Sequence, residues 1–128
     1  LTVSIDFFKT FAKLSGAGNV DYAIDSIDIS DMLINNGQSR REEYLFFIND
    51  MESSYRNNSY KLHVRTTERT RDPHAWIEEP VALYNTPLLY NLAKDIGERR
   101  NIAGENVEFD NEIRCAMDKE AIRITKDK

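Results

Sequence analysis

Cysteine, proline and glycine are scarce in this sequence. Of its 128 residues, one is cysteine, three are proline and five are glycine. The single thiol, Cys115, excludes an intramolecular disulfide and suits a reducing compartment. Internal repeats and low-complexity tracts are also absent, so the chain has the character of an ordinary globular sequence.

The sequence also lacks long apolar runs and an excess of positive charge. No run approaches the roughly 20 apolar residues that span a bilayer, so we expect no membrane association. Residues 1–16 lack the basic start and continuous apolar core of a secretion signal. We therefore expect a cytoplasmic protein, although the chain starts at Leu1 without methionine and is compatible with trimming. The formal net charge of −5 disfavours a general nucleic-acid binder, because such a protein needs a positive field.

Apolar and aromatic residues are present in the amounts that a folded protein needs. Hydrophobic residues make up 41% of the chain and aromatic residues 10%, which speaks against disorder. A chain of this length buries roughly two-thirds of its unfolded surface as one domain. We therefore expect a single soluble domain over residues 1–128.

The N-terminal part of the sequence is predicted to be helical. Residues 4–15 carry an apolar stripe at helical spacing, made of Phe7, Phe8, Phe11 and Leu14. Residues 20–35 fit a helix better than a strand, and the Asn35-Asn36-Gly37 run is a stop signal. Residues 40–57 follow a capping box and repeat apolar side chains at i, i+3, i+4 and i+7, which predicts a third helix.

Strand patterns begin at Tyr60. Tyr60, Leu62 and Val64 alternate with polar residues, which predicts a half-buried strand. The elements predicted after it are a turn over 68–73, an edge or bulged strand over 74–84 that contains Pro80, a helix over 86–99, a loop over 101–106, and two short strands over 107–113 and 121–125. This order predicts an α+β fold: a mostly antiparallel sheet of about four strands, with helices packed mainly on one face and a helical N-terminal part.

A cluster of basic and aromatic residues between positions 63 and 79 is the first candidate site. Its binding residues would be Arg65, Arg69, Arg71, His74 and Trp76. Exposed tryptophan beside arginine is a common interface anchor, and an acidic chain without a catalytic motif suits a protein partner better than a nucleic acid. The favoured hypothesis is a small regulatory domain, of the inhibitor or adaptor type, that engages a macromolecule through this stretch. A solvated strand face and a buried tryptophan are the structural alternative.

Two enzymatic hypotheses use the same stretch. In the first, His63 and His74 act as acid and base on a phosphodiester or nucleotide, and Arg65 or Arg69 holds the phosphate. In the second, Cys115 is a thiol nucleophile with His74 as its base. A small buried core residue is the alternative for Cys115.

Cofactor and metal signatures are missing from the sequence. His63 and His74 with Glu78 or Glu79 could supply two nitrogens and a carboxylate, but no HExxH or CxxC spacing is present. We therefore expect no metal and no cofactor. A strand edge near Pro80 would allow pairing between two copies of the chain, so a homodimer is a further possibility.

Overall fold

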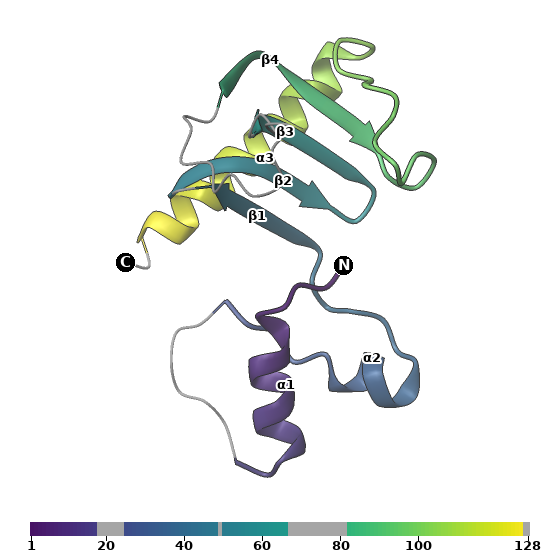
Figure 1. The fold of residues 1–128 in the computed structure, drawn as a ribbon, viewed down its shortest axis with the longest axis vertical. Coiled ribbons are helices and arrows are strands. Elements are labelled where there is room, and N and C mark those ends of the chain that lie inside the picture. The colour runs from purple at the N-terminus through teal and green to yellow at the C-terminus, as the bar shows by residue number, and fades with distance from the viewer. Residues whose placement is uncertain (18–24, 49, 67–81, 127–128) are drawn as a thin grey trace, which may run out of the picture. The chain divides into compact units, whose positions relative to one another are not determined.

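The computed structural model describes residues 1–17, 25–48, 50–66 and 82–126. The chain divides into two compact units, residues 1–43 and residues 44–126, drawn in Figure 1. Each unit is described by itself, and one domain over residues 1–128 stays a prediction. Among the described residues, the helices are all too short or too polar to cross a bilayer.

Two helices lie among the described residues of the N-terminal unit, both within segments that were predicted to be helical. Helix α1 spans Asp6–Leu14, and helix α2 spans Ser30–Asn35. The C-cap of α2 is Asn36, whose φ of 57° lies in the left-handed region that is common at the ends of helices. The helix predicted over residues 20–35 is wrong for residues 25–29, which are not helical; residues 18–24 lie outside the described part.

Residues 25–29 are not helical because their backbone bonds to polar side chains of α1. The Ile27 amide donates to Asp6 Oδ1 at 3.0 Å, and the Ile29 amide donates to Thr10 Oγ1 at 3.0 Å. Ser26 Oγ accepts a hydrogen bond from the Lys9 amide at 3.1 Å. Backbone groups that a helix would satisfy internally are thus satisfied by another element.

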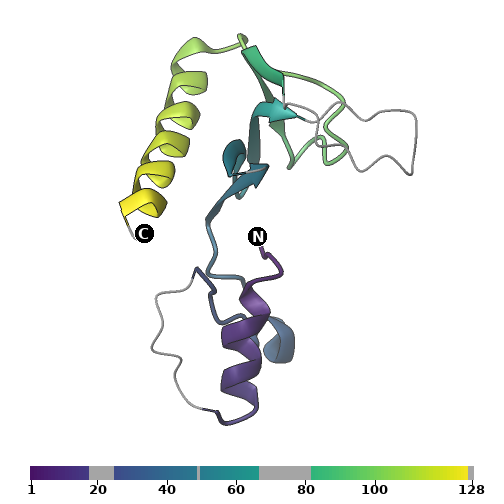
Figure 2. The same ribbon diagram turned by 60° about the vertical axis from the view of Figure 1, so that its left-hand side comes forward.

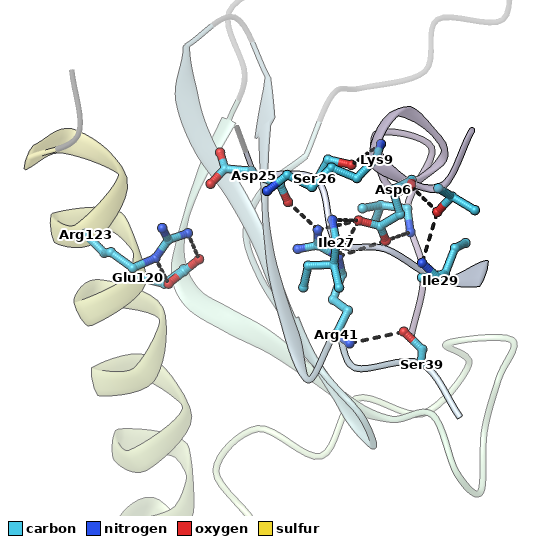
Figure 3. A network of polar contacts seen from close by, with 12 residues as sticks. Asp6, Lys9, Asp25, Ser26, Ile27, Ile29, Ser39, Arg41, Glu120 and Arg123 are labelled. Carbon is cyan, nitrogen blue, oxygen red and sulfur yellow. Dashed lines mark hydrogen bonds and ion pairs between the residues drawn. The ribbon is translucent and has the colours of Figure 1, made fainter. Parts of the chain in front are cut away.

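Asp6 is the centre of this network, and its side chain is completely buried. Figure 3 shows its carboxylate facing the guanidinium of Arg41, which is 7% exposed. Arg41 Nε donates to Asp6 Oδ2 at 3.0 Å, and Nη2 donates to Oδ1. The Val3 amide also donates to Oδ2 at 3.0 Å. Every oxygen of the buried carboxylate therefore has charged or amide donors, as a buried charge requires.

The ionised form of Asp6 is the stable one in the folded chain. Burial alone would raise the pKa of this carboxyl, but the hydrogen bonds from Arg41 and from the Val3 and Ile27 amides outweigh burial. The pKa of Asp6 therefore lies below its ordinary value. The contribution to stability is present above the unfolded-state pKa and is lost as the pH falls through the folded-state pKa.

In the second unit, the described residues form a sheet with one helix packed on it. The sheet has four strands in the order β1-β2-β3-β4, where β1 is Glu43–Ile48, β2 is Met51–Asn57, β3 is Tyr60–Thr66 and β4 is Ala82–Asn91. Strands β2 and β3 pair antiparallel, as do β3 and β4. Helix α3 spans Val107–Lys126 and lies along one face of the sheet (Figures 1 and 2). The predicted α+β class, with an antiparallel sheet and a helix on one face, is confirmed.

Short polar turns connect the first three strands. Asp50, between β1 and β2, has a φ of 61°, in the left-handed region that tight hairpin turns commonly use. Between β2 and β3, Asn57 Oδ1 accepts hydrogen bonds from the Ser59 and Tyr60 amides. The helix predicted over residues 40–57 is therefore wrong, because these turns fold the segment into a hairpin. Ser39 also forms no capping box, since its Oγ accepts the Arg41 amide instead.

Residues 82–84 lie in strand β4, in agreement with the strand predicted over 74–84, but β4 continues to Asn91. The helix predicted over 86–99 is wrong, because residues 86–91 are strand and residues 92–99 are not helical. Pro87 lies where the register is irregular. Proline is tolerated there because β4 is an edge strand. The two strands predicted over 107–113 and 121–125 are wrong, because both lie in α3.

The hydrophobic core lies between the sheet and α3. Its buried members are Leu45, Tyr55, Leu62, Val64, Leu89, Ile113 and Met117. Leu62 is paired with Tyr55 on one side and Leu89 on the other, so one row of apolar side chains crosses three strands. Ile113 and Met117 are four residues apart on α3 and cover this row.

Leu89 gives a direct test of this core. Leu89→Ala should lower the free energy of unfolding by about 2–5 kcal/mol, because the side chain is fully buried and its loss leaves a cavity. The measurement is urea unfolding followed by circular dichroism. Ile96→Ala is the control, since Ile96 is 76% exposed. Equal losses for the two variants would contradict the assignment of the core.

Asp6 gives the corresponding test of the N-terminal unit. Asp6→Asn should destabilise the chain by about 3 kcal/mol at neutral pH, because it leaves the buried Arg41 guanidinium without its counter-charge. The control is Asp118→Asn, which removes an exposed pair with Arg114 and should cost about 0.5 kcal/mol or less. Thermal unfolding of both variants makes the comparison, and similar melting temperatures would refute the central role of Asp6.

Candidate functional site

The outer face of the sheet, opposite α3, carries two of the sequence-predicted site residues, His63 and Arg65. Leu62 and Val64 of β3 lie in the core, so Lys61, His63 and Arg65 point to the other face. Cross-strand partners on this face include Ser54 and Leu88, which flank His63. The alternation in the sequence therefore predicted this face correctly.

Lys61 and His63 share one carboxylate on the outer face. Lys61 Nζ donates to Glu98 Oε1 at 2.8 Å, and His63 Nε2 lies 2.8 Å from Glu98 Oε2. The side chains are 22%, 15% and 28% exposed, in the order Lys61, His63, Glu98. We call these three residues the Lys61–His63–Glu98 cluster. It is a partly buried cluster, so its interactions are screened less than those of a surface pair.

The loop after β4 holds Glu98 in an unusual backbone conformation. Glu98 has a φ of 52°, in the left-handed region that costs a non-glycine residue about 1–2 kcal/mol. Asp95 Oδ2 accepts the Arg99 and Arg100 amides at 2.7 Å and 2.8 Å, which fixes the turn around Glu98. The contacts with Lys61 and His63 offset this strain and attach the loop to the sheet.

The cluster favours a neutral His63 and an ionised Glu98. Burial lowers the pKa of His63 and the Lys61 charge adds to this effect, while the hydrogen bond and charge of Glu98 oppose it; the net pKa lies below 6.5. Burial would raise the pKa of Glu98, but the hydrogen bonds and charges of Lys61 and His63 outweigh burial and lower it. At neutral pH one positive and one negative charge therefore balance each other in the cluster.

Aromatic side chains border the cluster on the outer face. The Tyr90 ring meets the His63 ring edge to face, with centroids 5.8 Å apart. Lys61 Nζ lies 5.9 Å from the centroid of Phe46, close enough for a weak cation–π contact. These contacts fix the directions of the Lys61 and His63 side chains and restrict the access of water to them.

The structure brings together only some of the sequence-predicted residues. His63 and Arg65 lie two residues apart on the outer face, and Arg65 Nη1 contacts Met51 Sδ at 3.6 Å. Cys115 is not a buried core residue: it is exposed on α3. The remaining candidates, Arg69, Arg71, His74 and Trp76, lie outside the described residues, as does Pro80. Their convergence with His63 stays a prediction.

Sequence reasoning missed two of the three residues in the cluster. Lys61 could have been found, because it alternates with Leu62 and shares the face of His63. Glu98 had no local signal, since it follows Gly97 in a segment that was assigned to a helix. Within residues 1–17, 25–48, 50–66 and 82–126, no three histidine, cysteine, aspartate or glutamate side chains are placed to bind a metal ion.

Comparisons with known proteins place these features in a family context. Residues 39–127 match the family model described as the C-terminal region of aryl-sulfatase. Human arylsulfatase A is 31% identical over 114 residues, which is 81% of this chain and 22% of that protein. Bovine arylsulfatase A is 30% identical over 112 residues, which is 80% of this chain and 22% of that protein. The chain thus spans about a fifth of the length of these curated relatives.

Solved structures share the fold. The crystal structure of PsFucS1 sulfatase from a Pseudoalteromonas species has a TM-score of 0.70 at 24% identity, covering 95% of this chain and 25% of that one. A structure from work on glycosaminoglycan metabolism by Bacteroides thetaiotaomicron has a TM-score of 0.61 at 22% identity, covering 89% of this chain and 24% of that one.

These matches overturn the function inferred from composition. The hypothesis of a small inhibitor or adaptor domain is wrong, and so are the ribonuclease-like and thiol-hydrolase alternatives, because the chain matches sulfatases over most of its length. Within the described residues, His63 is paired with the Glu98 carboxylate, and Cys115 is exposed on α3.

The balance of charges around His63 can be tested by titration. We expect the His63 imidazole to titrate below pH 6.5 in the folded chain, because burial disfavours its charged form. The unfolded chain then binds more protons just below pH 6.5, so the free energy of unfolding should fall as the pH falls below that value. Proton NMR of the histidine ring measures the midpoint.

Glu98→Gln sharpens this test. It should move the His63 midpoint further down, since the Glu98 carboxylate raises the pKa of His63. Glu105→Gln is the matched control, because Glu105 pairs with Arg100 in an exposed position. A midpoint above pH 6.5 would show that the cluster holds an imidazolium instead, and a midpoint that Glu98→Gln raises would show that Glu98 does not stabilise the charged ring.

Proposed function

Because this chain belongs to the family described as the C-terminal region of aryl-sulfatase, we propose that it serves as that region of an enzyme that hydrolyses sulfate esters. The observation that carries the proposal is the family match over residues 39–127, which includes all four strands and all of α3. Two mammalian arylsulfatases A at about the same identity support it. The fold of PsFucS1 sulfatase is consistent with it.

Within such an enzyme, the role we propose for residues 44–126 is structural support. The sheet and α3 close a core of their own, so this unit can hold loops in place without help from a ligand. The charges of Lys61 and Glu98 are balanced against each other, and His63 is neutral near pH 7. Little net positive charge remains in the cluster to attract a sulfate ester, so we assign sulfate recognition and bond cleavage to other parts of the enzyme.

The Lys61–His63–Glu98 cluster has a specific task in this proposal. It fixes the loop of residues 95–100 against the outer face, at the cost of the left-handed backbone at Glu98. Loops held by a rigid sheet are the usual carriers of binding residues. The cluster would thus keep one loop of the enzyme in a single conformation.

The activity itself can be tested with the polypeptide in which this sequence naturally occurs. We expect that polypeptide to release p-nitrophenol from p-nitrophenyl sulfate, and to prefer this substrate to p-nitrophenyl phosphate. The 128-residue chain by itself should release none, because the proposal assigns bond cleavage elsewhere. Absence of sulfate hydrolysis by the natural polypeptide under all buffer and metal conditions would reject the proposed function.

The supporting role makes a second, separable claim about that polypeptide. Glu98→Gln should lower its melting temperature by about 2–4 °C, with a change in kcat/KM of less than about threefold, because it weakens the attachment of a loop rather than removing a reacting group. Glu105→Gln should change neither quantity. A hundredfold loss of kcat with an unchanged melting temperature would place Glu98 in the reaction instead.

A further inference from the structure

Helix α1 buries polar side chains and exposes apolar ones. Its polar residues Asp6 and Thr10 are fully buried, whereas Phe8 is 57% exposed and Phe11 is 59% exposed. A surface helix of a globular protein normally buries its apolar stripe and exposes its polar one. The arrangement in α1 is the reverse, and so its apolar stripe needs an explanation.

The apolar stripe is continuous. We call it the aromatic face of α1, and it consists of Phe7, Phe8, Phe11 and Leu14, all of which are exposed. The rings of Phe7 and Phe11 stack with centroids 5.4 Å apart, which gives the face a defined shape before anything covers it. The spacing of i, i+1, i+4 and i+7 places the four side chains on one side of the helix.

The aromatic face cannot turn inward, because the opposite face of α1 is bonded to residues 26–30. Asp6 accepts the Ile27 amide, Thr10 accepts the Ile29 amide, and Lys13 Nζ donates to Asp28 Oδ2 at 2.6 Å. Figure 3 shows Asp6 and Lys9 facing this segment. Rotation of the helix would break all of these bonds and would leave the Asp6 carboxylate and its donors buried without partners. The polar network therefore holds the aromatic face outward.

An exposed aromatic face of this kind is covered by something in the working protein. Monomeric proteins rarely expose a contiguous apolar patch larger than a few hundred Å² unless the patch binds a partner. A lipid surface is a poor match, because interfacial helices use free basic residues beside the apolar face, and Lys13 is instead engaged by Asp28 and Ser30. The partner that fits is an apolar protein surface.

The comparisons indicate where that surface comes from. The chain spans 22% of the length of human arylsulfatase A and 25% of PsFucS1 sulfatase, so such proteins carry several times more polypeptide than this chain matches. We propose that the aromatic face of α1 is the docking surface for the remainder of a sulfatase polypeptide, which covers Phe8 and Phe11 with apolar side chains. This inference rests on the proposed function.

Thiol reactivity tests the docking surface without any need for activity. Phe11→Cys is introduced into the 128-residue chain and into the polypeptide in which the sequence naturally occurs. Alkylation by iodoacetamide is then followed at that peptide by mass spectrometry. The thiol should react at least about tenfold more slowly in the natural polypeptide, because a covered site must open before it reacts. Phe8→Cys is a second variant with the same expectation.

Asp118→Cys is the matched control, since Asp118 is a charged and exposed residue of α3. It should react at similar rates in the two polypeptides. Equal rates at positions 8 and 11 in both would overturn the proposal. Protection that appears in the 128-residue chain itself and grows with its concentration would also overturn it, by assigning the face to a second copy. Slow alkylation in a natural polypeptide that releases no sulfate would reject the proposed function but not the docking surface.

Discussion

The buried ion pair between Asp6 and Arg41 determines the arrangement of the N-terminal unit. A carboxylate that is fully removed from water must be surrounded by donors, and the chain supplies them from three separate segments: the Val3 amide, the Ile27 amide and the Arg41 guanidinium. Residues 35 positions apart are thus tied to one point. This ion pair sets the orientation of α1, because the helix must bury Asp6 even though its phenylalanines are thereby left exposed.

The sheet unit obeys a different constraint, which is the burial of one apolar row under α3. Leu89 lies in the middle of that row, and its backbone also forms hydrogen bonds at the edge of the sheet. Its amide donates to Asn101 Oδ1 at 2.9 Å, and its carbonyl accepts the Ile102 amide at 2.8 Å. The segment after β4 therefore covers part of an otherwise open strand edge. The same segment includes the Glu98 turn, so the core, the edge and the Lys61–His63–Glu98 cluster are physically connected.

The sequence predicted those elements whose local pattern agrees with their tertiary environment. The alternation from Tyr60 to Arg65 identified β3 and the correct outer face, because that strand has one buried side. The spacing of apolar residues in 40–57 fits a helix as well as it fits strands. The chain forms strands there because it turns at Asp50 and at Asn57. In α3, the buried side chains Ile113 and Met117 have the i, i+4 spacing of a helix, whereas two short strands were predicted there.

The candidate site was predictable only in part, for reasons of distance along the chain. Lys61 and His63 are close in sequence, but Glu98 reaches them from a loop 35 residues away, and its left-handed backbone follows no turn motif. Asp6 and Arg41 are also 35 residues apart, and no local pattern in the sequence predicts that they pair. The binding hypothesis was wrong because the sequence offers no motif that points to a function; the family match over residues 39–127 supplied the family.

The backbone of residues 26–30 covers the polar face of α1, and amide hydrogen exchange at Ile27 and Ile29 tests this arrangement. The amides of these two residues donate to side chains of α1 rather than to the backbone of a helix or strand. Both amides should exchange as slowly as the amides within α1, and Asp6→Asn should expose the Ile27 amide first. Exchange of both amides at the rate of an unstructured chain would contradict it.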